Sequence, residues 1–169
     1  MYNKFGQFID GKWQPSEKNE TYEVINPANE EVIGRASKAT SVDVDKALKS
    51  AEKGFQVWKK TPPWKRSSII RKIADLIRSK QDTLAKWLTL EVGKPFVEGK
   101  GEAGSAAEIF EWNSEETKRI YGQTVESRFE DTRVHVYYQP IGVVAALVPW
   151  NFPLILAARK ISTALAAGC

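Results

Sequence analysis

The feature that most constrains this fold is the uncharged stretch from Gly142 to Pro153. Its first seven residues, ending at Val148, are all small or apolar. Such a run predicts a strand buried on both faces, hence a parallel strand covered by helices. Pro149 would end this strand because it cannot donate to a ladder, and Pro153 suits the first turn of a following helix. Asn151 would then lie at the carboxyl end of a parallel strand, where open α/β sheets bind their ligands.

The composition is that of a globular protein. The 169 residues are 42% hydrophobic and 27% charged, which suits one domain or part of one. The longest uncharged run, Val134 to Ala158, contains prolines and polar residues, so it does not predict a membrane span. The first six residues lack the apolar core of a secretion signal. A single cysteine, Cys169, excludes an internal disulfide and fits a reducing compartment, so we expect a cytoplasmic location.

The net charge of +4 and the pI near 9.1 raise the possibility of nucleic-acid binding. The 25 basic residues, however, are interleaved with 21 acidic ones, as in the segment from Lys46 to Lys60. Mixed charge of this kind is typical of a solvated helix face. We therefore expect no nucleic-acid partner and no membrane partner.

Two short antiparallel strand pairs are predicted near the N-terminus. In the first, 7–9 and 12–14 flank the two-residue turn Asp10-Gly11. In the second, 22–25 and 32–36 flank a turn at Pro27. We expect both pairs to be small hairpins.

Four helices are predicted before residue 122. The first follows Ser41, carries Asp43 and Asp45 in its first turn, and ends before Pro62-Pro63. Its apolar stripe is Val44, Ala47, Leu48, Ala51, Phe55 and Trp58. The second helix carries the apolar residues Ile69, Ile70, Ile73, Ala74 and Ile77. The third carries Leu84, Ala85 and Leu88 and ends before Gly93 and Pro95. The fourth is expected from about Glu102 to Tyr121, with Gly122 as its cap.

Several motifs in register give the chain a family resemblance. They are Ile9-Asp10-Gly11-Lys12-Trp13, Asn26-Pro27-Ala28, Leu90-Glu91-Val92-Gly93-Lys94-Pro95, Ile120-Tyr121-Gly122, Gln139 to Leu154, Arg159-Lys160 and Ala164 to Cys169. Together they resemble the NAD(P)-dependent aldehyde dehydrogenases, most closely the succinate-semialdehyde dehydrogenase branch. The chain stops where that family has completed about its first third.

The resemblance implies an α/β fold, the N-terminal part of a Rossmann-like coenzyme-binding domain with small antiparallel strands and several helices. Residues 1–121 would form the first part of that domain. Residues 122–139, which include the alternating run 133–139, would form a bridging (oligomerisation) segment of a homo-dimer or homo-tetramer. Residues 140–169 would form the first βα unit of the Rossmann-like core. A buried strand needs neighbours that this sequence scarcely offers, so we expect the sequence to be cut.

Asn151 is the first candidate for chemistry. An amide N–H aimed at an oxyanion stabilises it, whereas the alternative from local sequence is that Asn151 only caps the next helix. The resemblance implies the first role, an oxyanion-hole donor. It also places Val148, Pro149 and Trp150 against an NAD or NADP coenzyme, largely through backbone groups. Trp150 could instead be an ordinary core aromatic.

Arg159 and Lys160 lie on a helix, expected over 153–167 and ended by Gly168, that is otherwise almost entirely apolar. Such a helix should be largely buried, and buried cations need partners. No acid follows Asp131, so the partner is either a distant carboxylate or an anionic ligand, unless the side chains extend to solvent. The resemblance implies that Arg159 holds a substrate carboxylate, which its planar fork suits; Lys160 is a further possible site residue.

Three other features are given no catalytic role. Gly99 to Gly104 matches G-x-G-x-x-G, but no buried strand precedes it, and its neighbouring glutamates would repel a phosphate. Cys169 follows a helix-ending glycine, where a small buried residue is ordinary. His135 has no acid or metal partner at a recognisable spacing, and the sequence contains no metal-ligand cluster.

The family mechanism is covalent: a cysteine thiolate adds to an aldehyde, hydride passes to the coenzyme, and a glutamate-activated water releases the acid. In the family, that cysteine and that glutamate belong to segments beyond Cys169. The lineage is thus predicted to be that of an enzyme, while the 169-residue chain alone should be inactive. The alternative is a non-catalytic fragment that serves as a binding or assembly module.

Overall fold

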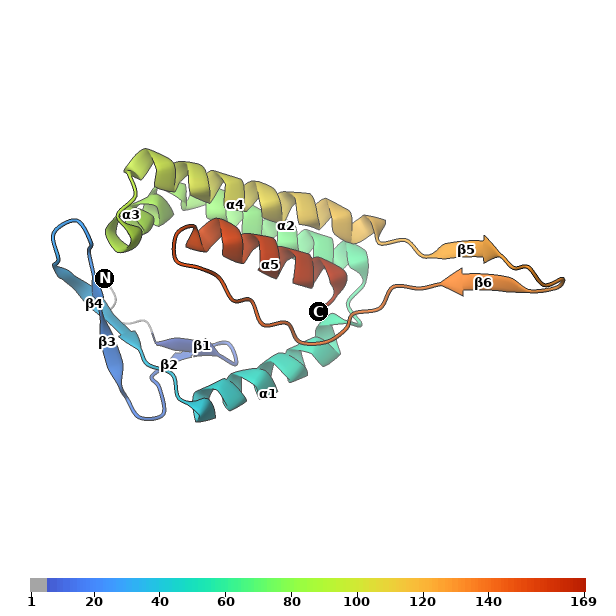
Figure 1. The fold of residues 1–169 in the computed structure, drawn as a ribbon, viewed down its shortest axis with the longest axis horizontal. Coiled ribbons are helices and arrows are strands. Elements are labelled where there is room, and N and C mark those ends of the chain that lie inside the picture. Colours follow the sequence, from blue (N-terminus) through green and yellow to red (C-terminus); the bar gives the residue numbers. More distant parts are fainter. Residues whose placement is uncertain (1–5) are drawn as a thin grey trace.

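The computed structural model describes residues 6–169, which form helices and strand pairs. The helices are α1 (Ser41–Trp58), α2 (Pro63–Ser79), α3 (Gln81–Val92), α4 (Phe96–Glu116) and α5 (Pro153–Ala167). The strands are β1 (Gln7–Ile9), β2 (Lys12–Gln14), β3 (Thr21–Ile25), β4 (Val32–Ser37), β5 (Gln123–Glu126) and β6 (Arg133–Val136). Helices α2, α4 and α5 lie side by side, α3 packs against α4, and α1 stands at an angle apart from them (Figure 1).

Each strand pair is an antiparallel hairpin. Strands β1 and β2 meet at Asp10-Gly11, both with positive φ (54° and 74°), and β3 pairs with β4 as predicted. Strands β5 and β6 pair in the register Gln123 to Val136, and their hairpin projects away from the helices (Figure 1). The segment 122–139 therefore contains a projecting hairpin, and of the alternating run 133–139 only Arg133–Val136 forms a strand.

Local signals place most helix ends. Thr40 caps α1 through a reciprocal bond with Asp43, α2 and α5 both begin with proline, and α3 ends at Gly93 with φ of 77°. The fourth helix differs from the prediction. It begins at Phe96, directly after Pro95, and ends at Glu116 with a 3₁₀ turn following, so neither the predicted start near 102 nor the Gly122 cap is correct.

The early start of α4 has a packing cause. A Cβ at Gly99 would lie 2.9 Å from the carbonyl oxygen of Ala85, so this glycine lets α4 approach α3 closely. Close packing outweighs the weak helix propensity of glycine.

The core lies between α2, α4 and α5. Its buried members are Ile70, Ala74, Ala106, Phe110, Ala158 and Ala166, with Trp58, Ile73, Ile77, Ile109, Leu154 and Leu165 packed around them. Small side chains on each helix allow close approach, and Ile70 is fully buried. Burying one such isoleucine contributes about 1.5–3 kcal/mol. This core fixes α5, the helix that follows the Asn151 turn.

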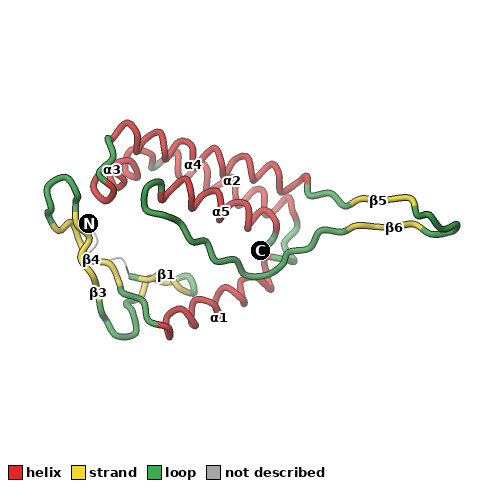
Figure 2. Tube along the Cα trace, viewed as in Figure 1, coloured by secondary structure: helices red, strands yellow, loops and turns green. Residues whose placement is uncertain are grey.

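The predicted strand over 142–148 is not formed. No residue from 142 to 148 belongs to a strand, and the segment runs as a loop past α5 (Figure 2). Its apolar side chains are exposed, Leu147 by 82%. The physical reason is that a ladder needs a neighbour, and within residues 6–169 every strand pairs only with its own hairpin partner.

The apolar stripe of helix α1 is more exposed to solvent than the sequence predicts. Val44 and Leu48 are half exposed, and the only residue of the helix that is buried is Asp43. Of the described helices, none combines the length and apolarity needed to cross a bilayer.

Candidate active-site turn

The Asn151 turn leads directly into α5. The residue that caps this helix is Phe152, and no side chain at that position closes the helix end. Instead, the backbone N–H groups of Leu154 and Ile155 donate to Oε1 of Glu102, over 2.9 and 3.2 Å. The alternative role of Asn151 as a helix cap is therefore wrong. Its side chain is exposed and has no hydrogen bond to any residue from 6 to 169.

A buried ion pair binds the backbone of this turn. The Nζ of Lys94 pairs with the carboxylate of Glu102, and their side chains are only 8% and 1% exposed. The same ammonium donates to the carbonyl oxygen of Asn151 over 3.1 Å and lies 4.2 Å from the centre of the Phe152 ring. The backbone of the turn is thus bound to α4 and to the α3–α4 connection, while the Asn151 amide remains at the surface.

Sequence reasoning missed this pair. In the sequence, Glu102 stands out only as a glutamate near the glycine motif and as the predicted start of the fourth helix. No local signal pairs it with Lys94, eight positions earlier in the chain. The rejection of the glycine motif is confirmed, because Gly99, Gly101 and Gly104 all lie inside α4.

The residues expected against the coenzyme precede Asn151. Val148 is 39% exposed and Trp150 is 78% exposed, and Pro149 is also at the surface. Trp150 is therefore not a core aromatic of this chain. The backbone of Val148, Pro149 and Trp150 thus lies in an exposed loop segment that directly precedes Asn151.

The predicted burial of Arg159 and Lys160 is wrong, because both are exposed. Helix α5 packs on α2 and α4 along one side, and its other flanks remain open. Arg159 lines a groove of about 380 Å³ between α4 and α5, together with Ser105, Glu108, Ile109, Trp112 and Ile155. Lys160 lies on a different flank of α5, so the structure does not bring these two cations together.

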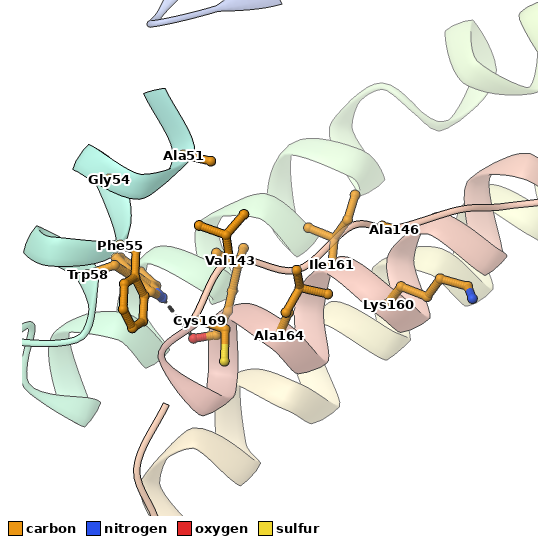
Figure 3. A pocket seen from close by; sticks show the side chains of 12 residues that line it. Ala51, Gly54, Phe55, Trp58, Val143, Ala146, Lys160, Ile161, Ala164 and Cys169 are labelled. Atoms are coloured by element: carbon orange, nitrogen blue, oxygen red, sulfur yellow. Dashed lines mark hydrogen bonds between the residues drawn. The ribbon is translucent and has the colours of Figure 1, made fainter. Parts of the chain in front are cut away.

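Lys160 instead lines an apolar cavity of about 400 Å³ between α1, residues 143–146 and α5 (Figure 3). The cavity is lined by Ala51, Gly54, Phe55, Trp58, Val143, Val144, Ala146, Lys160, Ile161, Ala164, Leu165 and Cys169. Neither Asn151 nor Arg159 is among these residues. The half-buried Cys169 thus faces apolar neighbours, which agrees with a structural role.

The far end of α5 is also held by a cation. Arg66 is buried and donates to the carbonyl oxygens of Thr61 and Ala166, over 2.9 and 3.4 Å. Burial lowers the pKa of this guanidinium. With Glu102 at the first turn and Arg66 at the last, charges of the favourable sign lie at both ends of the helix dipole. Both ends of α5, the helix that follows the Asn151 turn, are therefore bound by charged side chains.

His135 lies away from these sites. Its Nδ1 is 3.1 Å from the hydroxyl oxygen of Thr124, across the exposed β5–β6 hairpin. Among the described side chains, no group of three His, Cys, Asp or Glu could hold a metal ion.

Comparison with known proteins identifies this architecture. The chain is 42% identical over 162 residues to the glutarate-semialdehyde dehydrogenase of Pseudomonas aeruginosa. The match covers 96% of this chain and 34% of that protein. It is 42% identical over 161 residues to the succinate-semialdehyde dehydrogenase [NADP(+)] of Escherichia coli, covering 95% of this chain and 33% of that protein. The chain thus spans about a third of the length of these relatives.

A solved structure shares the fold. The betaine aldehyde dehydrogenase of Staphylococcus aureus, solved in complex with NAD⁺, superposes with a TM-score of 0.94 at 33% sequence identity. The match covers 98% of this chain and 34% of that one, so the fold described here is the N-terminal part of that fold. The aldehyde dehydrogenase family model matches residues 13–169. The chain therefore belongs to the aldehyde dehydrogenase family.

Proposed function

We propose that this chain forms the N-terminal part of an enzyme that oxidises a short, carboxylate-bearing aldehyde to the acid with NAD or NADP as coenzyme. The observation that carries the proposal is the exposed Asn151 amide on a turn whose backbone is bound by a buried ion pair. Two relatives support the substrate class, since succinate and glutarate semialdehydes both carry a carboxylate at the far end.

Asn151 would act as a hydrogen-bond donor to the aldehyde oxygen. When a nucleophile adds to an aldehyde, that oxygen becomes an oxyanion, and one preorganised donor lowers the activation barrier by about 3–4 kcal/mol. The donor must already be fixed, because an amide that has to reorient loses part of this gain. The binding of the turn to Lys94 and Glu102 supports this requirement.

The coenzyme would lie against residues 148–150. These residues fit such a group because their segment is exposed, next to Asn151, and not engaged in any ladder within residues 6–169. A bound NAD(P)⁺ would supply the hydride acceptor. The family's nucleophilic cysteine and general-base glutamate are not among the residues described, so this chain alone should not reduce coenzyme.

Asn151→Ala, in a protein of full family length that contains this chain, tests the catalytic proposal. We expect kcat to fall about 100- to 1,000-fold, while the thermal unfolding midpoint stays unchanged because the side chain is exposed. The measurement is steady-state formation of NAD(P)H. An unchanged kcat would contradict the role of Asn151.

Arg159 is proposed to bind the substrate carboxylate. Its guanidinium lies at the surface of the α4–α5 groove, where the planar fork can engage a carboxylate from an incoming ligand. Arg159→Leu should raise KM for succinate semialdehyde but not for a neutral aldehyde of similar length. Lys160→Leu is the matched control, because it removes a charge from a different flank of α5. Equal changes for both aldehydes would refute the substrate assignment.

The β5–β6 arm supports the proposal that the full protein is a homo-oligomer, a dimer or a tetramer. The arm projects from the helices (Figure 1). Val125 and Val134 on its strands are exposed, and so are Tyr137 and Tyr138 directly after β6. The same observation favours the second candidate function, a non-catalytic assembly module. Light scattering on the chain, together with a coenzyme-reduction assay on the full-length protein, separates the two. Since one thiol permits no internal disulfide, we further propose a reducing compartment, the cytoplasm.

A further inference from the structure

We infer that Lys94 and Glu102 are positioning residues that fix the backbone of the turn from which the Asn151 side chain projects. The inference depends on the proposed function, because it assumes that Asn151 acts on the substrate. Neither residue would touch substrate or coenzyme. Both would act through the backbone of the turn.

The pair is set apart by its burial. In the other ion pairs of residues 6–169, at least one side chain is more than a third exposed. In Lys94 and Glu102, both side chains are almost completely buried. Burying two opposite charges costs desolvation energy, and a well-packed apolar pair is often at least as stabilising. We therefore expect the pair to have a role other than stabilising the fold.

The contacts of the pair indicate that purpose. Oε1 of Glu102 accepts the N–H groups of Leu154 and Ile155, and its Oε2 accepts from Lys94. Lys94 then reaches back to the carbonyl oxygen of Asn151 over 3.1 Å. The two residues thus bind the main chain on both sides of Phe152, so that the turn and the first turn of α5 form one unit.

A side-chain N-cap would have satisfied the free N–H groups of α5 more simply. An Asn, Asp or Ser at the capping position satisfies the free N–H groups locally, but here that position is Phe152, whose ring packs on the ammonium of Lys94 at 4.2 Å. A side chain at the capping position would not bind the carbonyl oxygen of the residue before it, which here is Asn151. The Lys94–Glu102 pair binds that carbonyl as well, which fixes the peptide plane of the residue that carries the amide.

The expected kinetic signature follows from this geometry. A donor that acts mainly in the transition state contributes to kcat and little to ground-state binding. Displacing the turn should therefore lower kcat at least tenfold and leave KM for the aldehyde within about twofold. Loss of folded protein would also lower the apparent kcat without changing KM, so kcat is expressed per folded enzyme, with the folded fraction measured by circular dichroism.

The positioning itself can be measured on the 169-residue chain by NMR. In Glu102→Leu, the amide protons of Leu154 and Ile155 should exchange at least tenfold faster, because they lose their acceptor. Glu102→Gln keeps a side-chain oxygen and should restore most of the protection. Lys100→Met is the control. Lys100 lies on α4, as Glu102 does, and forms an exposed ion pair with Asp82 of α3, so its removal should leave these amides unchanged. Unchanged exchange in Glu102→Leu would overturn the inference.

The link to catalysis is tested by a double-mutant cycle in the full-length protein. Lys94→Met alone should lower kcat, yet in an Asn151→Ala background it should lower kcat no further. If Asn151→Ala itself leaves kcat unchanged, the proposed function fails, while the NMR result on positioning still stands. If Asn151→Ala lowers kcat and the Lys94→Met effect is fully additive, the positioning role fails. Should single variants not fold, the neutral double variant Lys94→Met/Glu102→Gln, which buries no unpaired charge, replaces them in the same cycle.

Discussion

The indole Nε1 of Trp58 donates a hydrogen bond to the carbonyl oxygen of Leu165 over 2.9 Å, across 107 positions of the sequence. This bond joins the last turn of α1 to the last turn of α5. Near it, Arg66 donates to the neighbouring carbonyl of Ala166. The carboxyl end of α5 is therefore bound by two side chains from different helices, as its amino end is bound by Glu102.

Trp58→Phe removes this bond and keeps an aromatic ring in place. The carbonyl of Leu165 loses one donor, so we expect the free energy of unfolding to fall by about 1 kcal/mol. Urea denaturation followed by circular dichroism measures the change. Trp112→Phe, at a residue that is 67% exposed, is the control and should change stability by less than about 0.5 kcal/mol. Equal effects at both sites would show that the bond adds nothing.

Gly168→Ala tests the end of α5. The residue has φ of 92°, and an added Cβ would lie 2.8 Å from Cγ of Pro140 and 3.3 Å from Nη1 of Arg66. The left-handed conformation alone costs a non-glycine residue about 1–2 kcal/mol, and the clash adds to it. Gly101→Ala is the matched control, because its Cβ would enter open space inside α4; it should stabilise the chain by about 0.5–1 kcal/mol. Thermal unfolding of both variants should therefore shift in opposite directions.

Ile70→Ala tests the core between α2, α4 and α5. The side chain is fully buried, so its truncation should lower the free energy of unfolding by about 2–5 kcal/mol. Ile69→Ala, on the adjacent and 37% exposed position of the same helix, should cost clearly less. If the two denaturant midpoints fell together, α2 would present a different face to the core.

Asp43 predicts a pH dependence of stability. A backbone hydrogen bond from Thr40, with a further one from Glu17, holds the pKa of this carboxyl below its ordinary value. A lowered folded-state pKa means that the unfolded chain binds more protons. The stabilisation is therefore fully present above the ordinary carboxyl value, near pH 4, and is lost as pH falls through the folded pKa.

The variant Asp43→Asn removes this titration. Denaturation midpoints measured between pH 6 and pH 2.5 should fall less steeply for Asp43→Asn than for the unmodified chain. Asp45→Asn, two residues later in the same helix but exposed, controls for the loss of one negative charge. An identical slope for Asp43→Asn and the unmodified chain would exclude the carboxyl as a source of acid sensitivity.

Local residue signals were sufficient wherever a short segment settles its own conformation. Asp10-Gly11 predicts the β1–β2 turn because glycine accepts a positive φ. Pro62-Pro63 predicts that α1 ends before them, and Pro153 predicts the start of α5. The family motifs depend on residue identity alone, and the family they predict is confirmed over residues 13–169.

Tertiary contacts decided the rest. The run 142–148 has the composition of a buried strand but stays a loop, because a strand forms only where a neighbour offers a ladder. Arg159 is exposed because helix packing, which composition does not specify, leaves that flank of α5 open. Lys94 reaches the carbonyl oxygen of Asn151 across 57 positions of the chain, and Glu102 accepts from the N–H of Leu154 across 52. Both contacts exist only because α4 and α5 pack together. The sequence alone determined which residue carries the amide, whereas folding determined what holds it in place, since long-range hydrogen bonds exist only between elements already packed side by side.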